Sequence, residues 1–141
     1  MEIQNLNCFK ALFTSGRDMP RIFFFLHYLN VVTFFPLLLF AFLPWPDATY
    51  SLNGRSLSYS EFWLTGMAPA MMLFMALVVF LCFAVALRKS WSRLGVFLFW
   101  SAPIALITFH SLMSTIIGLV FIGLWGVYVF KNNKLDLYYR V

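Results

Sequence analysis

Residues 94–130 read LGVFLFWSAPIALITFHSLMSTIIGLVFIGLWGVYVF, without one Asp, Glu, Lys or Arg. A single helix of this length would be roughly 55 Å long, whereas the hydrocarbon core of a bilayer is about 30 Å thick. The stretch must therefore turn back on itself, and polar residues in its middle predict where: Thr108, His110, Ser111, Ser114 and Thr115. We expect one span over about 94–109 and another over about 113–130. Because the first of these is short, a shallow re-entrant hairpin is the alternative.

Two further uncharged stretches, about 22–43 and about 62–87, are long enough to cross the core, which takes about 20 helical residues. The whole chain is 62% hydrophobic and only 11% charged, against about 45–50% and about 25% in soluble domains. These observations predict an all-α membrane protein, with four transmembrane helices that form a single domain over 1–141. Pro36, Pro69 and Pro103 fall inside spans and predict kinks, because proline removes a backbone hydrogen bond.

The only sizeable loop is expected over 47–61, between the first two spans. Within it, Asn53-Gly54 lies between Tyr50 and Tyr59. Asn-Gly favours the type I′ turn, in which both central residues have positive φ. The sequence therefore predicts a small β-hairpin, which needs support from the membrane or a partner because an isolated two-stranded hairpin is marginal in water.

Helix ends are marked by residues that suit caps. Ser58 or Ser60 is expected to cap the second span, with Glu61 favourable near its N-terminus, and Ser92 to cap the third. At the start of the chain, residues 1–17 carry apolar side chains at helical spacing. A short helix on the membrane surface is one interpretation of this segment, and a frayed terminus is the other.

Positive charge is distributed unevenly about the expected spans. Arg55 is the only one of the ten Lys and Arg residues that falls in the 47–61 loop. Cytoplasmic loops carry the excess of Lys and Arg in membrane proteins, so the loop is expected on the periplasmic side. Both termini are then cytoplasmic, in the inner (cytoplasmic) membrane of a bacterium. The other nine basic residues are Lys10, Arg17, Arg21, Arg88, Lys89, Arg93, Lys131, Lys134 and Arg140.

Residues that carry chemistry are scarce. No Asp, Glu, Lys or Arg lies inside an expected span, whereas ion-coupled transporters and proton relays usually place such groups within the membrane. His27 and His110 are expected near opposite ends of the spans, too far apart to ligate one haem. Cys8 and Cys82 are expected to be free thiols on the cytoplasmic side. We therefore expect no enzymatic activity, no cofactor and no metal.

Candidate contact residues are polar or small. One polar face of the first span can be hydrogen-bonding residues between helices, or the lining of a pathway. Small residues in the second and fourth spans mark close helix contacts, within the bundle or with another protein, and the hairpin turn is a candidate periplasmic contact. The polar face of the first span comprises His27, Asn30 and Thr33. The small residues are Gly66 and Ala70 in the second span and Ser114 and Gly118 in the fourth, and the hairpin residues are Asn53, Gly54 and Arg55.

Three classes of function are compatible with this pattern. The first is a binding protein that acts through its spans and periplasmic loop, either an accessory subunit of a membrane complex or an immunity protein against a membrane-targeting toxin. The second is a homo-oligomeric channel or carrier, in which several copies enclose a pore. The third is a membrane anchor for a cofactor-bearing partner. The first is the prediction. The expected partners are the lipid bilayer and a membrane protein or toxin, with no nucleic acid.

Overall fold

The computed structural model describes residues 15–43, 50–52 and 54–140 and is mainly helical. The chain divides into two compact units. The first comprises Met1–Phe25 with Leu81–Val141, and the second Leu26–Phe80. Two long helices, α2 over Arg21–Ala41 and α4 over Met67–Ala86, each contribute residues to both units.

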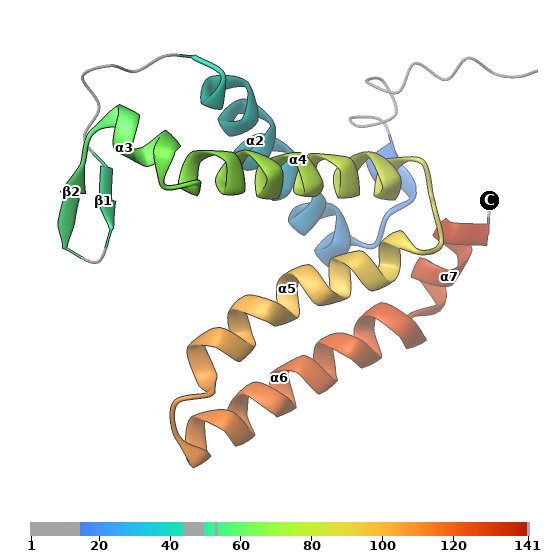
Figure 1. Ribbon diagram of the computed structural model, residues 1–141. Coiled ribbons are helices and arrows are strands. Elements are labelled where there is room, and N and C mark those ends of the chain that lie inside the picture. Colours follow the sequence, from blue (N-terminus) through green and yellow to red (C-terminus); the bar gives the residue numbers. More distant parts are fainter. Residues whose placement is uncertain (1–14, 44–49, 53, 141) are drawn as a thin grey trace, which may run out of the picture. The chain divides into compact units, whose positions relative to one another are not determined.

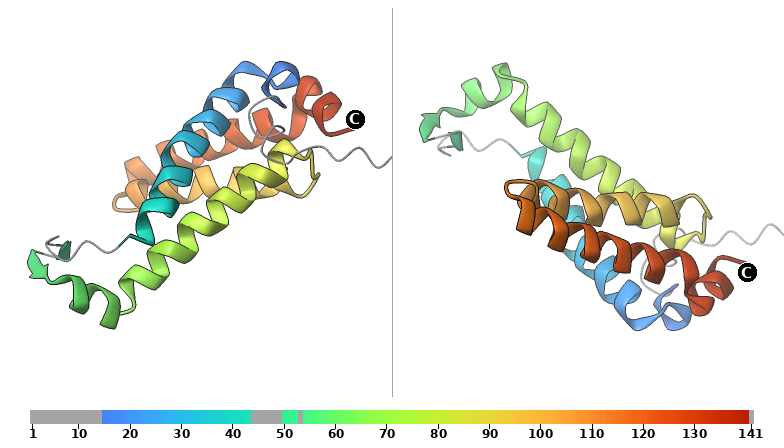
Figure 2. Two further views of the ribbon diagram at one scale, coloured as in Figure 1. Left: turned by 90° about the horizontal axis from the view of Figure 1, so that it is seen from above. Right: turned by 90° about the horizontal axis from the view of Figure 1, so that it is seen from below.

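The first unit is built on an antiparallel helix pair, α5 over Ser92–Thr108 and α6 over Leu112–Lys131. The two helices run side by side in opposite directions (Figures 1 and 2). The chain reverses between them where the polar cluster predicts. Ser111 caps α6, and its hydroxyl accepts a hydrogen bond from the backbone N–H of Ser114, 3.3 Å away. The predicted turn within 94–130 is confirmed.

The core of the first unit lies near the other end of this pair. A short 3₁₀ helix over Ser15–Asp18 leads into α2, and the helix α7 over Asn133–Arg140 leaves the end of α6 at a steep angle (Figure 1). Buried apolar side chains from the turn before α2 and from α2, α4, α5 and α7 form one cluster: Met19, Phe23, Leu81, Val85, Val96, Leu135 and Tyr138. Helix α7 is amphipathic, so it packs through Leu135 and Tyr138 while Leu137 stays exposed.

The second unit joins parts of α2 and α4 to a hairpin and a short helix. Strands β1 over Tyr50–Leu52 and β2 over Arg55–Leu57 pair antiparallel, with Leu52 opposite Arg55. Helix α3 over Tyr59–Leu64 follows directly. The rings of Phe34 in α2 and Phe74 in α4 meet edge to face, with centroids 5.8 Å apart. The predicted hairpin is confirmed at the register that a two-residue loop requires.

Three helices are long and apolar enough to cross a membrane: α2, α4 and α6. Helix α5 is apolar but shorter, with 17 residues. Large apolar side chains such as Leu73, Phe121 and Leu124 are more than half exposed, which suits contact with lipid and not with water. The chain thus has the features of a multi-pass membrane protein.

The helix expected over about 62–87 is interrupted, and this corrects the prediction. Gly66 has φ +77°, and its backbone N–H donates to the carbonyl of Trp63 at 3.1 Å, which closes α3. Pro69 has no N–H to donate to the carbonyl of Thr65, so a continuous helix would lose a bond there. Glycine and proline together therefore separate α3 from α4.

The start of α5 and the segment after α6 differ from what the sequence predicts, and most of residues 1–17 lie outside the described residues. Trp91 takes the N-cap position of α5, and its side chain does not cap the helix by a hydrogen bond. The predicted cap, Ser92, instead pairs through its hydroxyl with the hydroxyl of Tyr139 at 3.0 Å. The segment after α6, for which no helix is predicted from the sequence, forms α7 and packs on the first unit through Leu135 and Tyr138. The possible surface helix over 1–17 lies almost wholly outside the described residues, as does Cys8; Cys82 is buried and free.

Candidate functional site

The hairpin and α3 form a small ordered module in the second unit (Figure 1). The rings of Tyr50 in β1 and Phe62 in α3 stack, with centroids 4.1 Å apart and planes 3° from parallel. Leu57, opposite Tyr50 in the register, is buried. Strand residues that pair across a ladder share one face of the sheet. The hairpin therefore packs on α3 through the face that carries Tyr50 and Leu57.

A capping box fixes the start of α3. The Ser58 hydroxyl accepts from the backbone N–H of Glu61, while the Glu61 carboxylate accepts from the backbone N–H of Ser58 at 2.8 Å. The bond from the Ser58 backbone is the main cause that lowers the pKa of Glu61. The Ser58 hydroxyl lowers it further, slight burial opposes both, and the charge of Arg55 adds the smallest contribution. The carboxylate is thus held on Ser58, as capping boxes require. The predicted cap at Ser58 is confirmed.

The tip of the hairpin is presented to the outside. Gly54 has φ +80°, a conformation that glycine adopts without strain, and Gly54, Arg55 and Ser56 are all exposed. Asn53, the other predicted turn residue, lies outside the described residues. Because the strands behind the tip are anchored on α3, Arg55 projects from an ordered base.

An apolar pocket of about 210 Å³ lies beside this module, between the end of α2, the hairpin, α3 and the start of α4. The described residues that line it include no Lys, Arg, Asp, Glu or His. Helix α4 contributes Ala68 and three methionines, and the aromatic part of the lining is Phe40, Tyr50, Tyr59, Phe62 and Trp63. Sequence reasoning missed this pocket. The available signal was the aromatic cluster before Gly66 followed by Met71, Met72 and Met75 at spacings that share a helix face.

The candidate polar face of α2 is divided in the structure. His27 and Asn30 are buried, with 6% and 4% of their surface exposed, whereas Thr33 is exposed. Two polar side chains one helical turn apart therefore lie inside the protein, where polar groups need hydrogen-bond partners. Their interpretation as hydrogen-bonding residues between helices or as a pathway stays a prediction.

The small-residue candidates have different surroundings. Gly66 and Ala70 are exposed, and no atom of the described residues lies within 4 Å of a Cβ placed on Gly66, which serves the turn before α4. Gly118 is buried against α5, where an added Cβ would lie 2.7 Å from the Cβ of Thr108. Ser114 donates to the carbonyl of Thr108 at 2.6 Å. Ser114 and Gly118 thus contact α5 within the chain.

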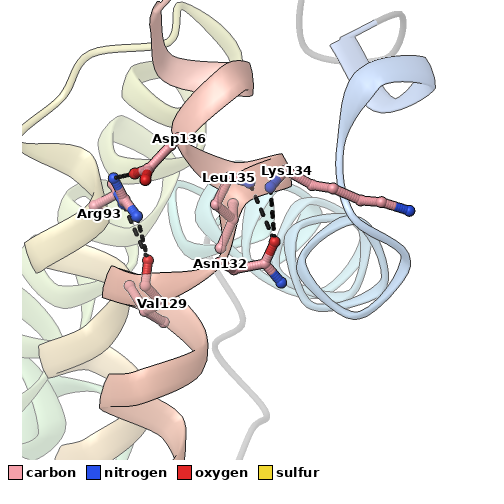
Figure 3. A network of polar contacts seen from close by, with 6 residues as sticks. All are labelled: Arg93, Val129, Asn132, Lys134, Leu135 and Asp136. Carbon is pink, nitrogen blue, oxygen red and sulfur yellow. Dashed lines mark hydrogen bonds and ion pairs between the residues drawn. The ribbon is translucent and has the colours of Figure 1, made fainter.

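A polar network that sequence reasoning missed holds α7 in the first unit (Figure 3). The guanidinium of Arg93 donates from Nε and Nη2 to the carbonyl of Val129, at 3.0 and 2.6 Å, and from Nη1 to the carboxylate of Asp136. The Asn132 side-chain oxygen accepts from the backbone of Lys134 and caps α7. Arg93 therefore replaces a bond that the Val129 carbonyl loses because α6 ends at Lys131.

Two tyrosines complete the attachment of α7. The buried Tyr138 hydroxyl donates to the carbonyl of Val85 at 2.9 Å, and the guanidinium of Arg88 lies 4.9 Å from the centre of the Tyr138 ring. Arg88 also pairs with Asp18 at 2.8 Å. Burial raises the pKa of Tyr139 to about 12, although its bond with Ser92 opposes the rise. These contacts tie α4, α5 and α7 together at the basic end of the first unit.

The described residues offer two kinds of functional surface, an exposed hairpin tip beside an apolar pocket and a basic, aromatic helix end. Within them, no group of three His, Cys, Asp or Glu side chains is placed to hold a metal ion. Comparisons with protein-family models, with curated proteins and with solved structures find no match for the chain. The site must therefore be interpreted from its own geometry.

Proposed function

We propose that this chain is a non-enzymatic binding protein of the bacterial inner membrane. It recognises another membrane protein, or a membrane-targeting toxin, through its helix faces and the hairpin tip. The observation that carries the proposal is the ordered hairpin: stacked on Phe62, anchored by Leu57 and followed by the Ser58 capping box. A preformed loop binds with less ordering cost, which is roughly 0.5–1.5 kcal/mol for each side chain immobilised.

In the proposed topology, α2, α4, α5 and α6 all cross the bilayer, both termini are cytoplasmic and the hairpin is periplasmic. The distribution of charge supports it. Arg88, Lys89 and Arg93 lie at or near the α4–α5 turn, and Lys134 and Arg140 in α7, whereas Arg55 is the only basic residue described between α2 and α4. Anionic cytoplasmic lipids attract such clusters by about 1 kcal/mol for each Lys or Arg.

The two roles within this class are an accessory subunit of a membrane complex and an immunity protein that blocks a toxin in the membrane. Both require contact surfaces, and neither requires catalytic groups. The tip offers a positively charged side chain next to small residues, Gly54 and Ser56. A partner surface that complements it would be acidic, because a rim charge steers association and sets specificity.

A photo-crosslinking amino acid at Ser56, introduced in cells of the source organism, tests this proposal. We expect one discrete crosslinked protein whose yield falls with Arg55→Ala. The matched control carries the same amino acid at Lys89, which is also exposed but lies in the α4–α5 turn, and it should not capture that protein. A crosslink only to a second copy of the chain would contradict the proposal and favour a homo-oligomeric channel. Haem or quinone in the purified protein would favour a cofactor anchor.

A further inference from the structure

The apolar pocket of the second unit has no part in the protein contact proposed above, which uses the charge at the hairpin tip. We propose that the pocket and this charge together form a binding site for one anionic phospholipid, with an acyl chain in the pocket and the phosphate at Arg55. The site shares Arg55 with the hairpin contact proposed above, but its pocket is distinct, and the Ala68 and Ala70 variants below test the pocket alone.

The lining of the pocket selects hydrocarbon. It consists of aliphatic, aromatic and methionine residues, and the polar side-chain atoms among them are the hydroxyls of Tyr50 and Tyr59 and the indole nitrogen of Trp63. Water enters a cavity only where several polar partners can hold it. Met71, Met72 and Met75 supply unbranched, adaptable walls that suit a flexible chain. The pocket adjoins the ends of α2 and α4, two helices long enough to span a membrane, so acyl chains are the nearest apolar ligand.

The hairpin register places a cation on the same side as the pocket. Tyr50 pairs with Leu57, and Leu52 with Arg55. Since side chains alternate along each strand, Tyr50, Leu57 and Arg55 share one face of the hairpin. Tyr50 lines the pocket, and Arg55 lies two residues beyond Leu57, about 7 Å along the strand. A guanidinium at this distance can reach a phosphate above the pocket mouth.

The charge of Arg55 is available for an anion. The described residues contain two ion pairs, Arg88 with Asp18 and Arg93 with Asp136, and neither involves Arg55. Glu61 is the acidic group near it, but its carboxylate is held by the backbone and hydroxyl of Ser58. Phosphate is the anion that a planar guanidinium binds best, through paired hydrogen bonds.

Two aromatic rings in the lining fit the same ligand. Tyr59 and Trp63 both line the pocket, and their rings meet edge to face with centroids 6.1 Å apart. Such side chains combine an apolar ring with a polar atom and concentrate at the headgroup level of membranes. A phospholipid bound here has its headgroup where these rings and Arg55 are.

Native mass spectrometry of the full chain tests the site, after reconstitution in vesicles of phosphatidylglycerol and phosphatidylcholine and extraction in mild detergent. We expect one retained phospholipid for each wild-type chain, with phosphatidylglycerol preferred. Ala68→Phe fills the pocket and should abolish retention. Ala70→Phe is the matched control, because Ala70 is on the same helix but exposed and outside the lining. If Ala68→Phe fails to fold, Ala41→Phe fills the pocket from α2.

The headgroup contact has its own pair of variants. Arg55→Gln should lower the preference for phosphatidylglycerol about five-fold, the effect expected of one basic residue at a lipid surface, whereas Arg55→Lys should keep most of it. Wild-type protein that retains no lipid would overturn the proposal. Equal retention by Ala68→Phe and Ala70→Phe would overturn it too, as would an unchanged preference in Arg55→Gln.

Discussion

Replacing Arg93 is expected to release α7 from the first unit. The guanidinium donates to the Val129 carbonyl with two nitrogens and to Asp136 with a third (Figure 3). Its side chain is 16% exposed and that of Asp136 is 34% exposed. In Arg93→Met, the Val129 carbonyl loses a charged donor, at a cost of about 1.5–3 kcal/mol. The partly exposed ion pair adds about 0.5–1 kcal/mol. We therefore expect a loss of about 2–4 kcal/mol.

The assay is reversible unfolding in mixed detergent micelles, combined with hydrogen exchange of the α7 amides. Arg93→Lys keeps the charge but not the fork of donors, so it should lose about half as much. Asp136→Asn should lose at most about 1 kcal/mol, because only the half-exposed pair is affected. Exchange should accelerate in α7 before it does in α5. An Arg93→Met protein with α7 as protected as in the wild type would refute the role assigned to Arg93.

Three further predictions concern the first unit. Gly118→Ala should destabilise the protein by about 1–3 kcal/mol, since the added Cβ would collide with Thr108. Gly123→Ala, with open space around it, should stabilise the protein by up to about 1 kcal/mol. Thermal unfolding compares the two variants, and equal effects would contradict close packing of α5 on α6. Arg88 has φ +57°, a conformation that glycine adopts without strain and alanine does not. In the same assay, Arg88→Gly should therefore be about 1 kcal/mol less destabilising than Arg88→Ala. The reverse order would show that the backbone at residue 88 is not strained. Burial raises the pKa of Tyr139 from 10.0 to about 12, so its contribution to stability is intact below pH 10.0 and lost as the pH rises through about 12. Ultraviolet titration of the phenolate, with Tyr139→Phe as reference, should show that Tyr139 ionises near pH 12. Ionisation near pH 10.0 would show that the ring is exposed.

The sequence specifies those features that depend on local chemistry. The Asn53-Gly54 turn, the Ser58 cap and the reversal at Ser111 each follow from side chains that act on the backbone next to them. The apolar stretches follow from composition alone. For this reason the approximate helix positions and the hairpin could be predicted from one sequence, and the structure has them there.

Features that depend on distant residues were missed. Gly66 was interpreted as a packing residue, although its spacing to Pro69 marks a helix break. Helix α7 is too short to be stable alone and needs Arg93, far away in the sequence, to hold it. The apolar pocket requires α2, α3 and α4 to meet, which periodicity within one segment cannot show. Leu135 and Tyr138, one turn apart after the Asn132 cap, were the signal for α7 that could have been used.

The membrane topology is the premise on which both proposed surfaces rest, and labelling of single cysteines tests it most directly. In a chain with Cys8→Ser and Cys82→Ala, cysteine is placed either at Ser56, in the exposed hairpin, or at Lys134, exposed in α7. Intact cells with a permeable outer membrane are treated with a maleimide that cannot cross the inner membrane. The proposed topology predicts labelling of Ser56→Cys in intact cells, and of Lys134→Cys only after the inner membrane is opened. Labelling of Lys134→Cys in intact cells would contradict it.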